Sequence, residues 1–107
     1  MNTDDMVFRS VFVDRDVDQA VLAQAKRLGA SAGSVYRLFI EAGLARLSQG
    51  TPLPAVSSEP AVLRTVHVHC TSDELLKSKA FQLRMAHDEL SRRVCTLGWL
   101  TIDAALN

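Results

Sequence analysis

The feature that most constrains the fold of this chain is an internal repeat. When the 107-residue sequence is shifted by 55 residues, "VFRSVFVDR" (7–15) aligns with "VLRTVHVHC" (62–70), and the alignment continues without a gap to residues 50 and 105. Nine aligned pairs are identical, whereas roughly three would be expected by chance from this composition. The identical pairs are Val7/Val62, Arg9/Arg64, Val11/Val66, Val13/Val68, Asp18/Asp73, Ala25/Ala80, Leu28/Leu83, Arg37/Arg92 and Gly43/Gly98. The repeat therefore predicts two structural units of one kind.

The segment between the two copies has the composition of a linker. "SQGTPLPAVSSEP" (48–60) contains all three prolines of the chain, one glycine and three serines. Such a segment favours turns and extended backbone over helices and strands. We therefore expect a first unit over residues 7–50, a linker over 51–61 and a second unit over 62–107, which together form one compact domain with one core.

Each copy begins with a predicted strand. Val11 and Val13 alternate with Ser10 and Phe12, and residues 65–68 alternate in the same way in the second copy. A period of two with β-branched residues is typical of a strand that has one buried face. A single short strand leaves its backbone groups unpaired, so we expect the two strands to pair with each other as an antiparallel ribbon.

Two helices are predicted after each strand. Within "DRDVDQAVLAQAKRLG" (14–29), apolar residues fall at helical spacing, acidic residues crowd the first turn, where the helix dipole favours them, and Gly29 is expected to end the helix. The equivalent helix of the second copy is predicted within residues 72–85.

The second helix of the first copy is predicted within "ASAGSVYRLFIEAGLARLSQG" (30–50), with Ser31 or Ser34 as its cap. It is apolar over a wide arc, so we expect it to be more buried than the first helix. Its equivalent in the second copy is predicted over residues 87–106.

The order of strand, helix, turn and helix resembles the ribbon-helix-helix superfamily of DNA-binding proteins, the Arc/MetJ/CopG type. The segments that carry the resemblance are "RSVFV" (9–13), "VDQAVLAQAKRLG" (17–29) and the turn "GASAGS" (29–34), which leads into "VYRLFIEAGL" (35–44). In the usual member of this superfamily, two identical chains form the ribbon. The predicted fold class is therefore mainly α with one short two-stranded antiparallel β-ribbon, in which two ribbon-helix-helix units form an intramolecular pseudo-dimer.

The resemblance implies a function as a DNA-binding protein. Such a protein inserts its β-ribbon into the major groove of double-stranded DNA, and the outward side chains of the ribbon contact the bases. Single-chain double versions of the fold are associated with DNA processing in conjugation. We therefore expect either a bacterial or plasmid transcriptional repressor or a DNA-transfer accessory protein, with possible self-association on DNA.

The positions implied to contact bases are the outward residues of the two strands. They are Ser10, Phe12, Thr65 and His67. Hydroxyl groups can bond to several base edges, an imidazole can donate to guanine, and a phenyl ring offers only apolar contact.

The resemblance also implies phosphate contacts from the strands. Arg9 and Arg64 lie at the entrances of the two strands. We expect each of them either to clamp a phosphate or to lie along the surface with a solvated head group.

A second phosphate contact is implied at the start of the second helix, where free amides and the positive end of the dipole favour an anion. The residues there are Ser31, Ala32, Gly33 and Ser34. The equivalent stretch of the second copy, His87-Asp88-Glu89, carries two carboxylates that repel phosphate, so we expect the first copy to anchor the DNA backbone better.

An alternative function follows from Phe8, Phe12 and Leu63, which all fall on the outward face of the strands. The superfamily more often has polar or basic residues at such positions. Clustered exposed apolar groups often mark a protein–protein contact. The alternative is therefore a protein–protein interaction module that keeps the fold but has lost DNA binding.

The formal net charge of the chain is zero, and each half carries six basic and six acidic residues. Overall charge therefore gives no indication of a nucleic-acid partner, and any anion binding must depend on local arrangement.

The sequence "VHVH" (66–69), followed by Cys70, raises the question of a metal site. A zinc site needs three or four convergent ligands, and the aligned residues of the first copy, Phe12, Asp14 and Arg15, do not form one. We expect no metal and no cofactor. Since no combination of residues typical of a catalytic site is present, we also expect the protein not to be an enzyme.

The two cysteines, Cys70 and Cys95, are expected to be reduced thiols of a cytoplasmic protein, with a disulfide as the alternative. No apolar run approaches the roughly 20 residues that cross a bilayer, so we expect no membrane association.

Overall fold

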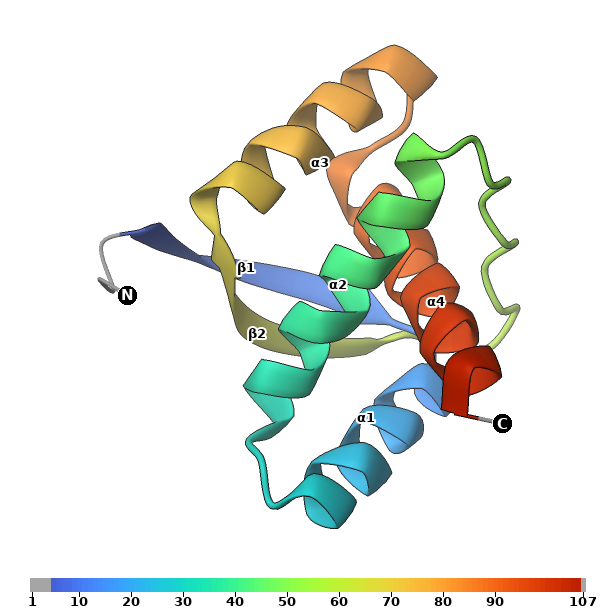
Figure 1. Cartoon of the computed structure of the whole chain (residues 1–107). Coiled ribbons are helices and arrows are strands. Elements are labelled where there is room, and N and C mark those ends of the chain that lie inside the picture. Colours follow the sequence, from blue (N-terminus) through green and yellow to red (C-terminus); the bar gives the residue numbers. More distant parts are fainter. Residues whose placement is uncertain (1–4, 107) are drawn as a thin grey trace.

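The computed structural model describes residues 5–106, and Asn107, the last residue of the predicted second unit, lies outside them. Two strands and four helices follow one another in the same order in both halves of the chain (Figure 1). They are β1 (Met6–Val13), α1 (Arg15–Leu28), α2 (Ala32–Ser48), β2 (Val62–His69), α3 (Cys70–Leu83) and α4 (His87–Leu106).

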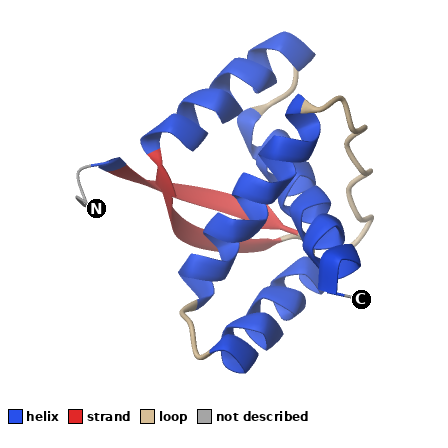
Figure 2. Cartoon of the chain, viewed as in Figure 1, coloured by secondary structure: helices blue, strands red, loops and turns tan. Residues whose placement is uncertain are grey.

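The two strands form one antiparallel ribbon, coloured red in Figure 2. Ser10 lies directly opposite Thr65 at its centre. These two positions are equivalent in the 55-residue repeat, so the register gives the ribbon an internal twofold axis that passes between them. The twofold axis of the ribbon therefore relates each residue of β1 from Val7 to Val13 to its counterpart in the repeat on β2.

The predicted pair of ribbon-helix-helix units is corrected by the structure. Two such units would need two ribbons, whereas the described residues contain a single two-stranded sheet. Each half supplies one eight-residue strand, and neither half contains a ribbon of its own. The physical reason is that a lone strand must find backbone partners outside its own half. The chain is accordingly mainly helical, with one ribbon shared between its halves.

The inner face of the ribbon forms one side of the core. Val11, Val13, Val66 and Val68 point inward and are at most 3% exposed, as expected from the alternation of apolar residues along each strand. Helices α2 and α4 cross one another over this face, while α1 and α3 lie on opposite sides of the crossing (Figure 1). The helices therefore cover one face of the ribbon.

The crossing of α2 and α4 depends on two glycines. A Cβ atom at Gly43 would overlap the carbonyl oxygen of Val94, and a Cβ atom at Gly98 would overlap the carbonyl oxygen of Phe39. Gly43 and Gly98 are equivalent in the repeat, and so are Phe39 and Val94. The two helices can approach this closely only because neither glycine carries a side chain.

The linker begins with a turn at residues 49–50 and then passes beside α4 to Val62 without regular secondary structure (Figure 1). Arg92 donates hydrogen bonds to the carbonyl oxygens of Ser57 at 3.2 Å and Glu59 at 3.1 Å. Its Nε also donates to Asp14 Oδ1 at 2.5 Å, and Asp14 Oδ2 accepts from the backbone N–H of Ser57 at 3.2 Å. One arginine and one aspartate therefore attach the linker to the body of the protein.

Replacing Gly98 with alanine tests the helix crossing. We predict that Gly98→Ala lowers the free energy of unfolding by about 3 kcal/mol, because the new methyl group forces two backbones apart in a packed core. Urea denaturation measures the change. Gly33→Ala is the matched control, since a Cβ at Gly33 would meet no atom within 4 Å, and it should change stability by less than about 1 kcal/mol. Equal effects of the two substitutions would contradict this view of the crossing.

Candidate nucleic-acid interface

The outer face of the ribbon is open to solvent. Six side chains alternate with the buried valines and are all exposed. They are Phe8, Ser10, Phe12, Leu63, Thr65 and His67. This set contains the four residues that the sequence predicts to contact bases, so the structure brings those four together on one surface.

The six side chains form three pairs across the strands, and the two ends of the ribbon differ. At the centre, the hydroxyl residues Ser10 and Thr65 lie opposite each other. At one end, Phe8 lies opposite His67, and their ring centroids are 3.8 Å apart. At the other end, Phe12 lies opposite Leu63. The backbone is therefore symmetric about its centre, while the outward side chains are not.

Two reciprocal ion pairs hold the ribbon to the helices. Arg9 of β1 donates through Nε and Nη2 to the two carboxylate oxygens of Asp73 on α3, at 2.6 and 2.7 Å. Arg64 of β2 donates in the same way to Asp18 on α1, at 2.9 and 2.8 Å. Both pairs join the first half of the chain to the second. Since each carboxylate is almost fully buried, removing its partner would leave a charge without compensation.

The electrostatics of these pairs follow from their hydrogen bonds. The hydrogen bonds from Arg64 hold the pKa of Asp18 below its ordinary value, and those from Arg9 do the same for the pKa of Asp73. The hydroxyl of Tyr36 also donates to Asp18, and burial is the main cause of the raised pKa of that tyrosine. Both aspartates are therefore held in the ionised form inside the fold.

The two strand arginines were expected either to clamp phosphates or to lie solvated on the surface. In the structure, each guanidinium donates through Nε and Nη2 to a carboxylate, which leaves three of its five N–H donors, two of them on Nη1, that could reach a phosphate. The phosphate contact of Arg9 and Arg64 stays a prediction. The sequence did contain a signal for the ion pairs, because Asp18 and Asp73 are themselves an identical pair in the repeat.

The start of α2 has the features expected of an anion contact. The Oγ of Ser31 accepts a hydrogen bond from the backbone N–H of Ser34 at 3.1 Å, and this cap begins the helix at Ala32. No acidic residue lies in the first turn, and Nη2 of Arg37 lies 3.4 Å from the Oγ of Ser34. Arg37 thus brings a guanidinium to the first turn of α2, where Gly33 and its neighbours were predicted to contact a phosphate.

The start of α4 differs in charge. Asp88 and Glu89 lie in its first turn, and Glu89 pairs with Arg93 at 2.9 Å. His87 Nε2 lies 3.8 Å from Asp73 Oδ1. Negative charge at this helix start disfavours a phosphate, so the two halves offer different surfaces to an anion.

The histidines and cysteines near the end of β2 do not converge. His67 is exposed on the outer face, whereas His69 at the end of β2 is half-buried, with its Nε2 3.6 Å from Oε1 of Glu41 on α2. Cys70 is exposed and Cys95 is buried, both are free thiols, and burial raises the pKa of Cys95 to about 12. Over residues 5–106, no three His, Cys, Asp or Glu residues lie close enough to hold a metal ion.

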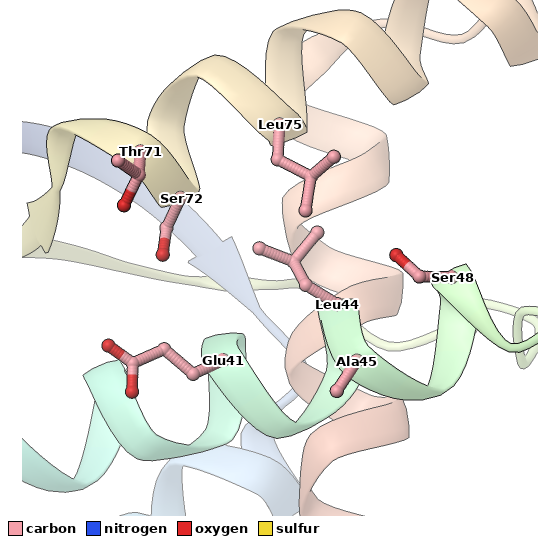
Figure 3. Close-up of a pocket in the computed structure, with 7 residues that line it drawn as sticks. All are labelled: Glu41, Leu44, Ala45, Ser48, Thr71, Ser72 and Leu75. Atoms are coloured by element: carbon pink, nitrogen blue, oxygen red, sulfur yellow. The ribbon is translucent and has the colours of Figure 1, made fainter.

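A groove of about 280 Å³ lies between α2 and α3 (Figure 3). Leu44 and Leu75 point toward one another across it (Figure 3). Glu41 of α2 lies at the end of the groove that is nearest to the first turn of α3. The remaining lining residues are Ala45, Ser48, Thr71 and Ser72. This lining combines one carboxylate with hydroxyl and aliphatic groups. The four residues predicted to contact bases lie instead on the outer face of the ribbon.

Comparison with known proteins returned no match from family models, curated proteins or solved structures. None of the helices within residues 5–106 has the length and apolar character needed to cross a membrane.

Replacing Asp18 with asparagine tests the reciprocal ion pairs. We predict that Asp18→Asn lowers the free energy of unfolding at pH 7 by about 2 kcal/mol, less than for a fully buried pair, because the Arg64 side chain is 45% exposed. Asp16→Asn is the matched control in the same turn of α1, and it should have an effect below about 0.5 kcal/mol because Asp16 is exposed. Equal losses in the two variants, measured by urea denaturation, would contradict the role of the pair.

The effect of Asp18→Asn should also depend on pH. The folded pKa of Asp18 is lowered, so the stabilisation from its charge is fully present above the unfolded pKa of about 3.9 and is lost as pH falls through the folded value. The difference in stability between the wild type and the variant should therefore be constant from pH 7 to pH 5 and shrink below about pH 3.9. A difference that is unchanged at the lowest pH where both proteins fold would contradict this origin.

Proposed function

We propose that this protein binds double-stranded DNA by inserting the outer face of the β1–β2 ribbon into the major groove. The observation that carries the proposal is an antiparallel two-stranded ribbon with one face packed on the core and an outer face whose side chains are exposed from Phe8 to Phe12 and from Leu63 to His67. The four helices pack around the inner face, so they leave the outer one accessible. This is the arrangement in which a ribbon can read base edges.

The dimensions of the ribbon are compatible with this mode of binding. Two paired strands lie about 4.8 Å apart, and the major groove is about 12 Å wide, which leaves room for side chains on both sides. The exposed residues at the centre are Ser10 and Thr65, and their hydroxyl groups can donate to or accept from several base edges. His67 adds a ring nitrogen that can donate to guanine.

Phosphate binding in this proposal comes mainly from the start of α2. The first turn there is small and uncharged, and Arg37 adds a guanidinium. The zero net charge and the commitment of Arg9 and Arg64 to carboxylates limit the number of neutralised phosphates. We therefore expect binding to weaken as salt is added, with the slope reporting a small number of phosphate contacts.

The biological role that we propose is regulation or processing of DNA in the cytoplasm. The resemblance to the ribbon-helix-helix superfamily supports either a bacterial or plasmid transcriptional repressor or a DNA-transfer accessory protein. Neither role requires catalysis or a cofactor from this chain.

A protein–protein contact at the same surface is the second candidate function. The observation that favours it is the exposure of three large apolar side chains on the ribbon, which is 67% for Phe8, 54% for Leu63 and 39% for Phe12. An exposed apolar group of this kind can mark an interface. Self-association of several chains along DNA would use such residues without excluding the first function.

Fluorescence anisotropy with a pool of mixed-sequence duplexes tests the proposed function. Thr65→Asp, which places a carboxylate at the exposed centre of the ribbon, should weaken binding by at least tenfold through repulsion in the groove. Ser78→Asp is the matched control, because it adds the same charge at an exposed position of α3, and it should change affinity less than twofold.

Two results would contradict the proposal. One is the absence of binding even at low salt, and the other is an equal loss of affinity in the two variants. In the first case the exposed apolar side chains of the ribbon would become the site at which to seek a protein partner.

A further inference from the structure

We infer that the DNA site recognised by the ribbon is asymmetric, with thymine methyl groups at one end and a guanine at the other. This inference rests on the proposed function and concerns the same surface. It follows from a contrast between the ribbon backbone, which is symmetric about Ser10 and Thr65, and its outward side chains, which are not. A symmetric ribbon with different ends can meet a duplex productively in one orientation only.

The end formed by Phe12 and Leu63 can make only apolar contacts. Neither side chain has a hydrogen-bond donor or acceptor, and both are exposed. In the major groove, the apolar group that base pairs present is the 5-methyl of thymine. Both A·T and G·C pairs lose water from their polar edges here, but only an A·T pair gains an apolar contact in return, through its methyl group. The chemistry therefore selects A·T pairs with their methyl groups against Phe12 and Leu63.

The end formed by Phe8 and His67 offers a hydrogen bond. The two rings lie with centroids 3.8 Å apart, so Phe8 restricts the orientation of the imidazole. A ring N–H of His67 can donate to N7 or O6 of guanine. His69, the next histidine along the strand, is half-buried with its Nε2 3.6 Å from Oε1 of Glu41, so it is less available for this contact. His67 is therefore the hydrogen-bonding residue of this end among the six outward side chains.

The distance between the two ends of the ribbon determines how far apart the guanine and the thymines of the DNA site lie. Phe8 and Phe12 are four residues apart on one strand, which corresponds to about 13 Å along the ribbon. The rise of duplex DNA is about 3.4 Å per base pair, so the two ends lie roughly four base pairs apart. We expect a site with a guanine, a short centre read by the hydroxyl groups, and thymines on the far side.

Base analogues test this inference on the preferred duplex once it has been selected from the random pool. Deoxyuridine lacks only the 5-methyl group of thymine, so its substitution in one half of the site should weaken binding about fourfold for each methyl contacted. The same substitution in the other half should change affinity less than 1.5-fold. 7-Deazaguanine, which lacks the N7 acceptor, should weaken binding in the half where deoxyuridine has no effect.

Protein variants assign each end of the duplex to an end of the ribbon. In Phe12→Ala, and independently in Leu63→Ala, the effect of deoxyuridine should fall toward onefold because the apolar partner is gone. Phe81→Ala is the matched control, since Phe81 is 86% exposed on α3, and it should leave the fourfold effect intact. Circular dichroism of all three variants verifies that each of them is folded.

The outcomes separate this inference from the proposed function. Specific binding to a palindromic site, or an equal deoxyuridine effect in both halves, would overturn the asymmetry and leave DNA binding standing. Retention of the deoxyuridine effect in both Phe12→Ala and Leu63→Ala would overturn the assignment of the methyl contact. Absence of any duplex binding would overturn the proposed function and the inference together.

Discussion

The pairing of one strand from each half of the chain is the interaction on which the rest of this structure depends. An eight-residue strand has backbone donors and acceptors that its own half cannot satisfy. The ribbon satisfies them by joining Met6–Val13 to Val62–His69, and this pairing fixes the halves about an axis between Ser10 and Thr65. Neither half has an inner ribbon face to cover unless the other half is present, so the core is a property of the whole chain.

Two further features reinforce this mutual dependence, and both are duplicated in the repeat. The ion pairs Arg9–Asp73 and Arg64–Asp18 link the strand of each half to a helix of the other. The close crossing of α2 and α4 at Gly43 and Gly98 brings the two central helices together. Each of these residues is identical to its counterpart in the other copy, and the two counterparts make equivalent contacts. The outward side chains of the ribbon carry no such constraint, and there the copies differ.

The sequence predicted the local structure well because local structure depends on nearby residues. The alternation around Val11 and Val13 predicted a strand, and Gly29, at a φ of 64°, ends the first helix as predicted. The single antiparallel ribbon formed between the two strands is confirmed. The description of each half as a ribbon-helix-helix unit was wrong, because each half supplies only one strand.

In the candidate site too, features set by local structure were predicted, whereas contacts between the halves were not. The four predicted base-contacting residues lie on the exposed face because side-chain direction follows from the strand period. The partners of Arg9 and Arg64 could not be predicted from periodicity, since Asp73 and Asp18 reach them only after the two halves have packed together. The contact of His69 with Glu41 likewise forms only when β2 and α2 have packed together.

The measurement that tests the central claim most directly is nuclear magnetic resonance mapping of the backbone amides during titration with duplex DNA. We predict that the largest shift changes occur on the ribbon around Ser10 and Thr65 and at the start of α2, while amides near the end of α3 stay unchanged. Saturable changes confined to other helices, with the ribbon unaffected, would contradict DNA binding by the ribbon and place the binding surface elsewhere on the protein.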